Sequence, residues 1–230
     1  MFTVRKSHDR GVTNFGWLDS KHSFSFGDYY DPNHHHFRAL RVINDDRIDA
    51  NGGFPSHPHR DMEILTCVLS GELAHKDSMG TGATVRPGEW QRMTAGRGVV
   101  HSEFNPSNEN PTHLLQIWLL PDHKGLEPEY EQKMLPFGDG AWTTIASPDG
   151  RDGSLTIHQD AVISTARLGT GQSLDYPIHP GRGVWLHVAT GSVTVNGTDF
   201  DEGDAVCVEG EPRMNLTGRN NGEVILFDLA

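Results

Sequence analysis

The chain has 230 residues, enough for one large domain or two of ordinary size. Hydrophobic residues make up 35% of it, and the 26 glycines and 13 prolines indicate a globular protein rich in turns. The net charge of −12 disfavours direct binding to nucleic acid or to anionic membranes, while it leaves a basic protein partner possible.

The N-terminal segment and the cysteines both bear on the compartment. The segment MFTVRKSHDRGVTNFG lacks the apolar core of a secretory signal, and no stretch approaches the ~18 apolar residues of a spanning helix. Cys67 and Cys207 lie outside any metal-binding or redox motif, so we expect two buried thiols rather than a disulfide. These features predict a cytoplasmic protein.

Short apolar or alternating segments follow one another along the chain, separated by turns rich in Gly, Pro, Asn and Asp. In order, they span residues 22–26, 37–43, 63–69, 112–120, 183–190, 192–197 and 223–229. No long segment has helical periodicity. Many short strands at this spacing predict an all-β protein built from sandwiches or barrels.

Glycine turns recur in the same order in the two halves of the chain. The matching pairs are Gly71 in VLSGELAH with Gly88 in RPGEW, and Gly191 in VATGSVTV with Gly203 in DEGDAV. This internal repeat predicts two copies of one β-barrel. The polar, weakly periodic stretch 126–145 is expected to be a linker between domains at 1–125 and 146–230.

The segment HPHRDMEI raises the possibility of a metal site. With 14 histidines in the chain, roughly 0.9 His-x-His pairs are expected by chance, so the spacing of His57 and His59 decides nothing alone. On a strand, however, both side chains point the same way, and AGRGVVHSEFN supplies His101 and Glu103 with the same spacing. Three imidazoles and one carboxylate on neighbouring strands suit a divalent transition metal with coordination positions left for a substrate.

The order of GGFPSHPHRDME and AGRGVVHSEFN resembles the cupin arrangement and, more narrowly, the pirin family. The segments HSFSFGDYYDP, LRVINDD, DSMG, LQIW and RDGSLTIHQD extend this resemblance over essentially the whole chain. It implies a bicupin, two jelly-roll-like β-barrels in tandem, with one metal held in the N-terminal barrel. The implied ligands are His57, His59, His101 and Glu103.

The resemblance also implies an activity, because bacterial pirin-like proteins of this length include quercetin 2,3-dioxygenases. Such an enzyme would cleave the heterocyclic ring of a flavonol with O2 and release carbon monoxide. Fe(II) is the expected metal, while Ni, Cu, Co, Mn and Zn suit the same donors. Glu103 is expected to accept the proton of the flavonol 3-hydroxyl. We expect a monomer and no organic cofactor, since no Gly-rich phosphate-binding motif is present.

A regulatory role is the alternative. Some pirins are described as iron-binding, redox-sensitive regulators that act through contacts with other proteins. The same four ligands serve both functions, so the motif does not separate them.

Several neighbouring residues carry weaker expectations. Glu63 stands where many other cupins have a ligand, but in pirins the carboxylate comes from the second motif, so a structural role is expected. Cys67 replaces the tyrosine usual in the family, which alters either the pocket wall or the core. Phe24 and Phe26 are expected on one strand face, where packing in the core is favoured over lining the pocket of an aromatic substrate. The run His34–His36 is expected in a solvated loop.

The second half of the chain is expected to hold no metal. His179 and His187 would lie about 26 Å apart on a straight strand, too far for one ion. The region matching the second motif, EGEPRMNLTGRNNGEV, contains no histidine. The remaining histidines, including His75, are expected to be surface residues or hydrogen-bonded core residues.

Overall fold

The computed structural model describes all 230 residues and consists almost entirely of β-strands and turns, which confirms the predicted all-β class. Its only helical segments are two short 3-10 turns, η1 (Ser7–Asp9) and η2 (Arg151–Gly153). None of its helical segments is long and apolar enough to span a bilayer. The chain forms two compact units. The N-terminal unit comprises residues 11–136 and 155–159, and the C-terminal unit comprises residues 1–10, 137–154 and 160–230.

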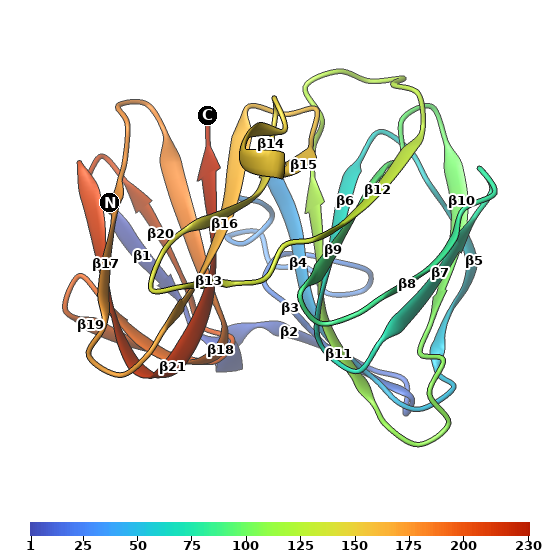
Figure 1. Cartoon of the computed structure of the whole chain (residues 1–230), viewed down its shortest axis with the longest axis horizontal. Helices are drawn as coiled ribbons and strands as arrows, with labels where there is room; N and C mark the ends of the chain where they lie inside the picture. Colours follow the sequence, from blue (N-terminus) through green and yellow to red (C-terminus); the bar gives the residue numbers. More distant parts are fainter. The chain divides into compact units, whose positions relative to one another are not determined.

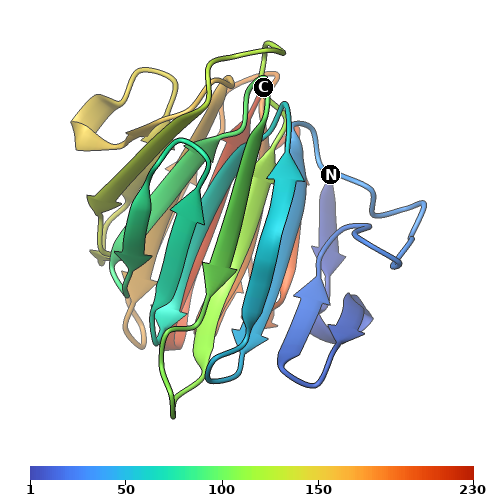
Figure 2. The same cartoon turned by 90° about the vertical axis from the view of Figure 1, so that its right-hand side faces the viewer.

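The N-terminal unit contains a seven-stranded and a four-stranded antiparallel sheet. In spatial order, the larger sheet consists of β12 (Glu129–Met134), β9 (Glu89–Thr94), β6 (Glu63–Ser70), β11 (Thr112–Leu119), β4 (Leu40–Ile48), β3 (Leu18–His22) and β2 (Gly11–Asn14). The smaller consists of β5 (Gly53–His59), β10 (Val99–Phe104), β7 (Leu73–Asp77) and β8 (Gly82–Val85). Figure 2 shows the smaller sheet in front, with β5 in cyan and β10 in green.

Apolar side chains from both sheets of the N-terminal unit form a shared core. The cluster consists of Leu18, Ile48, Val68, Leu73, Val85 and Leu114, which come from β3, β4, β6, β7, β8 and β11. Burying side chains of this size stabilises the fold by about 1.5–3 kcal/mol each. Along β4, Asn44 and Asp46 share a face with Ile48, so inward positions change from apolar to polar along one strand.

The predicted linker at 126–145 differs from the structure. Within it, β12 pairs with β9 over its whole length, and β13 (Gly138–Asp139) pairs with β16 (Ala161–Leu168). The sequence EYEQKM gave no apolar signal because β12 is an edge strand in which no residue is fully buried.

The domain boundaries also differ from those expected. Residues 1–10 belong to the C-terminal unit, where β1 (Phe2–Arg5) pairs with β20 (Ala205–Glu209). Residues 155–159, which include β15 (Leu155–Thr156), belong to the N-terminal unit. Pairing between distant strands set these boundaries, and no local sequence pattern reports it.

The C-terminal unit is built around a sheet with the order β1, β20, β18 (Gly183–Val195), β21 (Arg213–Leu229), β16 and β14 (Thr143–Ser147). Three further strands join it: β13 pairs with β16, β17 (Ser173–Pro177) pairs with β21, and β19 (Thr198–Asp201) pairs with β18. Figure 1 shows the last strands of the chain in orange to red. The core contains Val184, Leu186, Phe200, Leu216 and Leu226.

The predicted glycine repeat is visible in the backbone. Gly71 follows β6 with φ of 75°, and Gly191 lies between two register shifts in β18 with φ of 68°. Residues with a Cβ atom rarely adopt this conformation, so glycine is required at both turns.

Candidate metal centre

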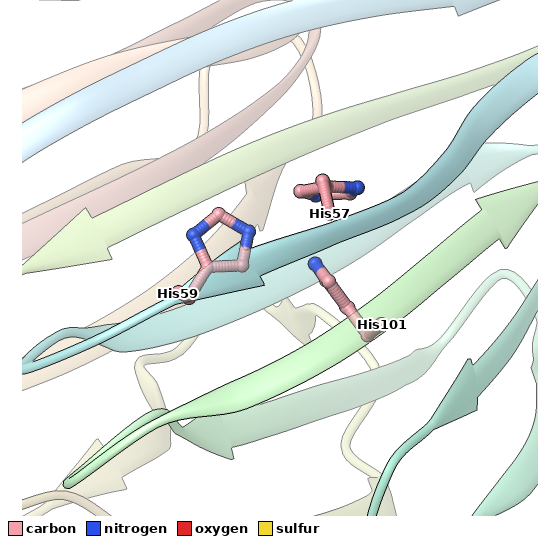
Figure 3. A group of neighbouring side chains, drawn as sticks. All are labelled: His57, His59 and His101. Atoms are coloured by element: carbon pink, nitrogen blue, oxygen red, sulfur yellow. The ribbon is translucent and has the colours of Figure 1, made fainter.

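Three of the predicted ligands converge on one face of the four-stranded sheet. Strands β5 and β10 are antiparallel neighbours, with His101 opposite His57 and Val99 opposite His59. The ring centroids lie 4.5 Å apart for His57 and His101, and 4.8 Å apart for each of the other two pairs. One donor nitrogen of each ring lies within 4.8 Å of the others. Figure 3 shows the rings facing one another from the two strands.

The protonation of this triad fits a metal ion. Nδ1 of His57 donates a hydrogen bond of 2.8 Å to the carbonyl of Pro55, which leaves its Nε2 lone pair available. Burial, followed by the nearby charge of His57, lowers the pKa of His59 to about 4. Burial, followed by the charges of the neighbouring histidines, lowers the pKa of His101 to about 2. At neutral pH, both imidazoles are therefore neutral, the form that binds a metal.

The ring nitrogens of His101 give a second sign of fit. Both are buried, and neither has a hydrogen-bond partner. A buried polar atom without a partner costs about 1–3 kcal/mol, so such atoms usually mark a site for an ion or ligand. The residues present therefore suit a divalent transition metal with imidazole ligands.

Glu103, the fourth predicted ligand, lies further along β10, beyond a register shift in its pairing with β5. Its carboxylate shares a group with His75 and His101, whose donor atoms all lie within 4.8 Å of one another. His101 therefore belongs to two groups, one with His57 and His59 and one with Glu103. The structure brings all four predicted residues to one region, but their four donor atoms do not all lie within 4.8 Å of one another.

Glu103 is almost completely buried, with 2% of its surface exposed. Its Oε1 accepts a hydrogen bond of 3.3 Å from Gln91, and its Oε2 accepts one of 2.8 Å from Gln116. Burial raises the pKa of Glu103 to about 7, although the bond from Gln91 opposes the change, and the charge of Asp46 raises it further. A carboxyl group with this pKa can take up or release a proton at neutral pH.

The two amides belong to a row of polar residues across the seven-stranded sheet. Consecutive cross-strand partners in this polar row are His22, Asn44, Gln116, Thr66, Gln91 and Gln132. The Thr66 hydroxyl donates to Oε1 of Gln116 (2.9 Å) and accepts from Nε2 of Gln91 (3.1 Å). These bonds direct both amide NH2 groups toward Glu103.

Sequence reasoning missed the polar row. A signal was present, because Thr66 and Gln116 each interrupt an apolar strand, in EILTCVL and THLLQIWLL. A buried polar side chain in such a strand needs a hydrogen-bond partner, and here the partners are one another and Glu103.

A second missed feature is the pair His75 and Asp77 on β7. His75 is buried, as a hydrogen-bonded core histidine was expected to be, but its ring lies only 5.3 Å from that of His101. Its Nε2 lies 3.0 Å from the Asp77 carboxylate, which also accepts the backbone N–H groups of Met79 and Thr81. The carboxylate fixes the proton on Nε2, so the buried, unpartnered Nδ1 of His75 carries a lone pair beside the centre.

A cavity of about 440 Å³ opens beside the centre and is bordered by His57, His59 and Glu103. Its walls include the aromatic side chains of Phe15, Phe26, Phe54 and Trp118. The rings of Phe26 and Trp118 meet edge to face with centroids 5.4 Å apart, and Trp118 also contacts His59 at 4.9 Å. This arrangement suits a flat apolar molecule whose reacting end faces the histidines.

The predicted strand at 22–26 is wrong, and the error affects one cavity residue. Strand β3 ends at His22, and Phe26 forms an isolated bridge with Tyr29 before the turn at Gly27. Phe24 is in the core, as expected, with 2% exposure. Phe26 instead lines the cavity, because the chain leaves the sheet before reaching it.

The remaining predicted residues lie outside the metal-ligating groups. Glu63 is fully buried and is bonded to the Thr94 hydroxyl (3.1 Å) and to Nδ1 of His158 (3.3 Å), outside the metal-ligating groups. Cys67 and Cys207 are buried and form no disulfide, as predicted, and Cys67 does not line the cavity. The run His34–His36 lies in a loop.

The two histidines singled out in the second half belong to different elements. His179 is exposed in the segment after β17, whereas His187 is buried within β18, opposite Ala205 and Ile225. The metal-free state of this half remains a prediction.

Comparison with known proteins identifies relatives along the whole chain. The pirin family profile matches residues 3–119, and a profile described as the quercetinase C-terminal cupin domain matches residues 144–229. The chain is 46% identical over 229 residues to a protein of Escherichia coli K12 named quercetin 2,3-dioxygenase, covering 100% of this chain and 99% of that relative.

Solved structures agree with these matches. The bacterial pirin YhhW from Escherichia coli, solved in complex with nickel(II), has a TM-score of 0.96 and 45% identity, covering 100% of this chain and 99% of that one. A quercetin 2,3-dioxygenase from Acinetobacter baumannii, at 21% identity, shares the fold with a TM-score of 0.81 over 98% of this chain and 85% of its own. With the paired histidines on β5 and β10 and relatives matching from end to end, the chain belongs to the pirin family and contains two cupin domains in tandem.

Proposed function

We propose that this protein is a metal-dependent dioxygenase that cleaves the heterocyclic ring of quercetin-like flavonols with O2 and releases carbon monoxide. The observation that carries the proposal is the histidine triad beside the buried carboxyl group of Glu103, with the rings of His59 and His101 neutral. These residues open onto a cavity of about 440 Å³ that aromatic side chains help to line. Small-molecule sites usually have volumes of about 300–1,000 Å³, so a flavonol is of suitable size. The name of the Escherichia coli relative supports the same substrate class.

One divalent metal, with Fe(II) favoured, would be held by His57, His59, His101 and Glu103. A nickel(II) complex of the related bacterial pirin supports a divalent ion, while the identity of the working metal is part of this proposal. An open-shell divalent metal supplies Lewis acidity toward the flavonol 3-hydroxyl and the unpaired electrons needed for a spin-forbidden reaction with triplet O2.

Glu103 would accept the proton of the flavonol 3-hydroxyl on one of its carboxylate oxygens. In the metal-free protein its pKa is about 7, and a base is most effective when its pKa is close to the working pH. Gln91 and Gln116 orient the carboxylate through its two oxygens, which keeps the acceptor in place during the transfer.

The aromatic walls would hold the flavonol rings and exclude water. Phe26 and Trp118 form one edge-to-face pair at the cavity, and Phe54 lies against both Trp17 and His57. Flat apolar contacts of this kind position a planar substrate while leaving its polar edge for the buried carboxylates.

The test is to strip the protein of metal and reload it separately with Fe, Ni, Cu, Co, Mn and Zn. Oxygen uptake and carbon monoxide release are then measured with a panel of flavonols. We expect turnover with Fe(II), whereas turnover with another metal and not with iron would contradict the metal assignment. Iron-loaded protein that consumes no oxygen with any flavonol would contradict the enzymatic proposal and leave the regulatory role.

A further inference from the structure

Asp46 is a buried carboxylate that the proposed chemistry does not use. It lies on β4 with 3% exposure and borders the same cavity as His57, His59 and Glu103. Its Oδ1 has no hydrogen-bond partner, and it is the only carboxylate oxygen among the buried side-chain atoms in that state. A buried acceptor without a donor costs about 1–3 kcal/mol, more when charged, so a donor from a ligand is the expected complement.

Ser20 forms a side-chain hydrogen bond with the carboxyl group, but Oδ1 still has no donor, and the other neighbouring polar groups do not supply one. Asn44, on the same face of β4, lies 2.7 Å from Nδ1 of His22, and Nε2 of His22 lies 2.8 Å from the Thr13 hydroxyl. The charged groups that act on the carboxyl are Asp45 and Glu103, and both are acids. The protein therefore places an acceptor at the cavity wall and leaves the donor to another molecule.

A structural role would look different. Asp204 in the C-terminal unit is comparably buried, yet it accepts hydrogen bonds from Nζ of Lys6 and from two backbone N–H groups. Asp77, near the metal centre, is likewise saturated by His75 and two backbone N–H groups. Asp46 is the exception, and it is the one of these three that borders the cavity.

We propose that Oδ1 of Asp46 accepts a hydrogen bond from a second phenolic hydroxyl of the substrate, distinct from the 3-hydroxyl that Glu103 receives. The assignment rests on the proposed function and narrows its substrate class to planar aromatic molecules with at least two hydroxyl groups. Asp46 is then a specificity residue: it selects polyhydroxylated substrates because an unhydroxylated ring leaves Oδ1 buried and without a donor. The aromatic walls hold the rings, and the two carboxyl groups recognise the hydroxyls.

The experiment measures binding apart from turnover. Protein loaded with Zn(II), which has no redox chemistry, is titrated without oxygen with quercetin and with 3-hydroxyflavone, which keeps only the 3-hydroxyl. Binding is followed by the absorbance of the flavonol and by quenching of tryptophan fluorescence. The wild-type protein should bind quercetin at least about 10-fold more tightly than 3-hydroxyflavone, because hydrogen bonds to charged groups contribute this much.

Asp46→Asn should reduce that preference by about 10-fold through weaker binding of quercetin, with binding of 3-hydroxyflavone little changed. The matched control is Asp45→Asn on the opposite face of β4, where the carboxylate contacts His113 and does not border the cavity. It should keep the wild-type preference. Under turnover with iron, Asp46→Asn should raise KM for quercetin more than it lowers kcat.

The outcomes separate this inference from the proposed function. Wild-type protein that binds no flavonol overturns both. Wild-type protein that binds quercetin and 3-hydroxyflavone equally overturns the role of Asp46 alone, and this test needs no variant to fold. A preference that survives in Asp46→Asn, with zinc content and circular dichroism like wild type, also overturns the role of Asp46 alone.

Discussion

The buried carboxyl groups that border the N-terminal cavity contrast with Asp204, a buried carboxylate of the C-terminal unit. In the N-terminal unit, burial raises the pKa values of Asp46 and Glu103 to about 7, and Oδ1 of Asp46 has no partner. In the C-terminal unit, hydrogen bonds from Lys6, Ser7 and Asp201 outweigh burial and lower the pKa of Asp204. The N-terminal barrel thus has a buried carboxylate oxygen without a donor at its cavity, whereas Asp204 in the C-terminal barrel accepts a full set of hydrogen bonds. A buried polar group without a partner lowers the stability of the fold, and such groups are characteristic of functional sites.

The sharpest test of the comparison removes one histidine from each unit. His101→Ala should abolish both metal binding and flavonol turnover, because the site would retain only two imidazoles and a carboxylate. His179→Ala, an exposed histidine of the C-terminal unit, should keep the wild-type metal content and rate. Metal stoichiometry and oxygen uptake are measured on the same samples. A second metal per chain that disappears in His179→Ala would contradict the metal-free prediction for that half.

Glu103→Gln separates metal binding from catalysis. The three imidazoles should retain a substantial part of the metal, while turnover should fall by about 10²–10⁴-fold, as expected for removal of a general base. Glu63→Gln is the matched control, because that carboxylate lies outside the metal-ligating groups and does not border the cavity. Metal content and initial rates at saturating flavonol check the prediction. A fully loaded and fully active Glu103→Gln would show that another group takes the proton.

Gln116→Leu tests whether the polar row orients Glu103. It removes the donor to Oε2, and losses of this kind beside a metal ligand typically cost about 10–100-fold in activity. Loss of a donor to the carboxylate also raises the pKa of Glu103, so the acid limb of the pH profile of kcat/KM should move to higher pH. The control is Gln132→Leu at the far end of the row, whose side chain donates to the carbonyl of Thr84. An unshifted pH profile in Gln116→Leu would argue against this role.

The smallest effects concern stability and have opposite signs in the two units. The depressed pKa of Asp204 contributes stability above its unfolded pKa near 3.8, and this is lost as pH falls through the folded pKa. Asp204→Asn should therefore lower the free energy of unfolding by about 1–3 kcal/mol at pH 7 and by less in acid. The raised pKa of Asp46 costs stability increasingly from pH 4 to above 7, so Asp46→Asn should stabilise the metal-free protein at pH 8.

Urea denaturation of the metal-free variants between pH 4 and pH 8 measures both effects. Each variant is compared with wild type at the same pH, so that other titrating groups cancel. Destabilisation of equal size and sign in both variants would remove the proposed contrast between the two units.

Local patterns predicted a large part of this protein. Alternation along short strands and the glycine turns indicated the all-β class and the repeated barrel, since both signals are read within a few residues. His57 with His59, and His101 with Glu103, could be paired because residues two apart on a strand share a face. Weak local signals failed elsewhere: the polar edge strand β12 was taken for a linker, and Phe26 was placed on a strand that had already ended.

The sequence by itself determined the fold class and the candidate ligands, because both depend on spacing along single strands. Only the tertiary structure decided what surrounds them. Gln91, Gln116 and Thr66 come from three strands, and the register between those strands aims two amides at Glu103. The positions of His75 beside His101 and of Asp46 at the cavity wall have the same origin. Cross-strand pairing joins residues tens of positions apart, so no local pattern reports it, although it controls the partners and charge of the site.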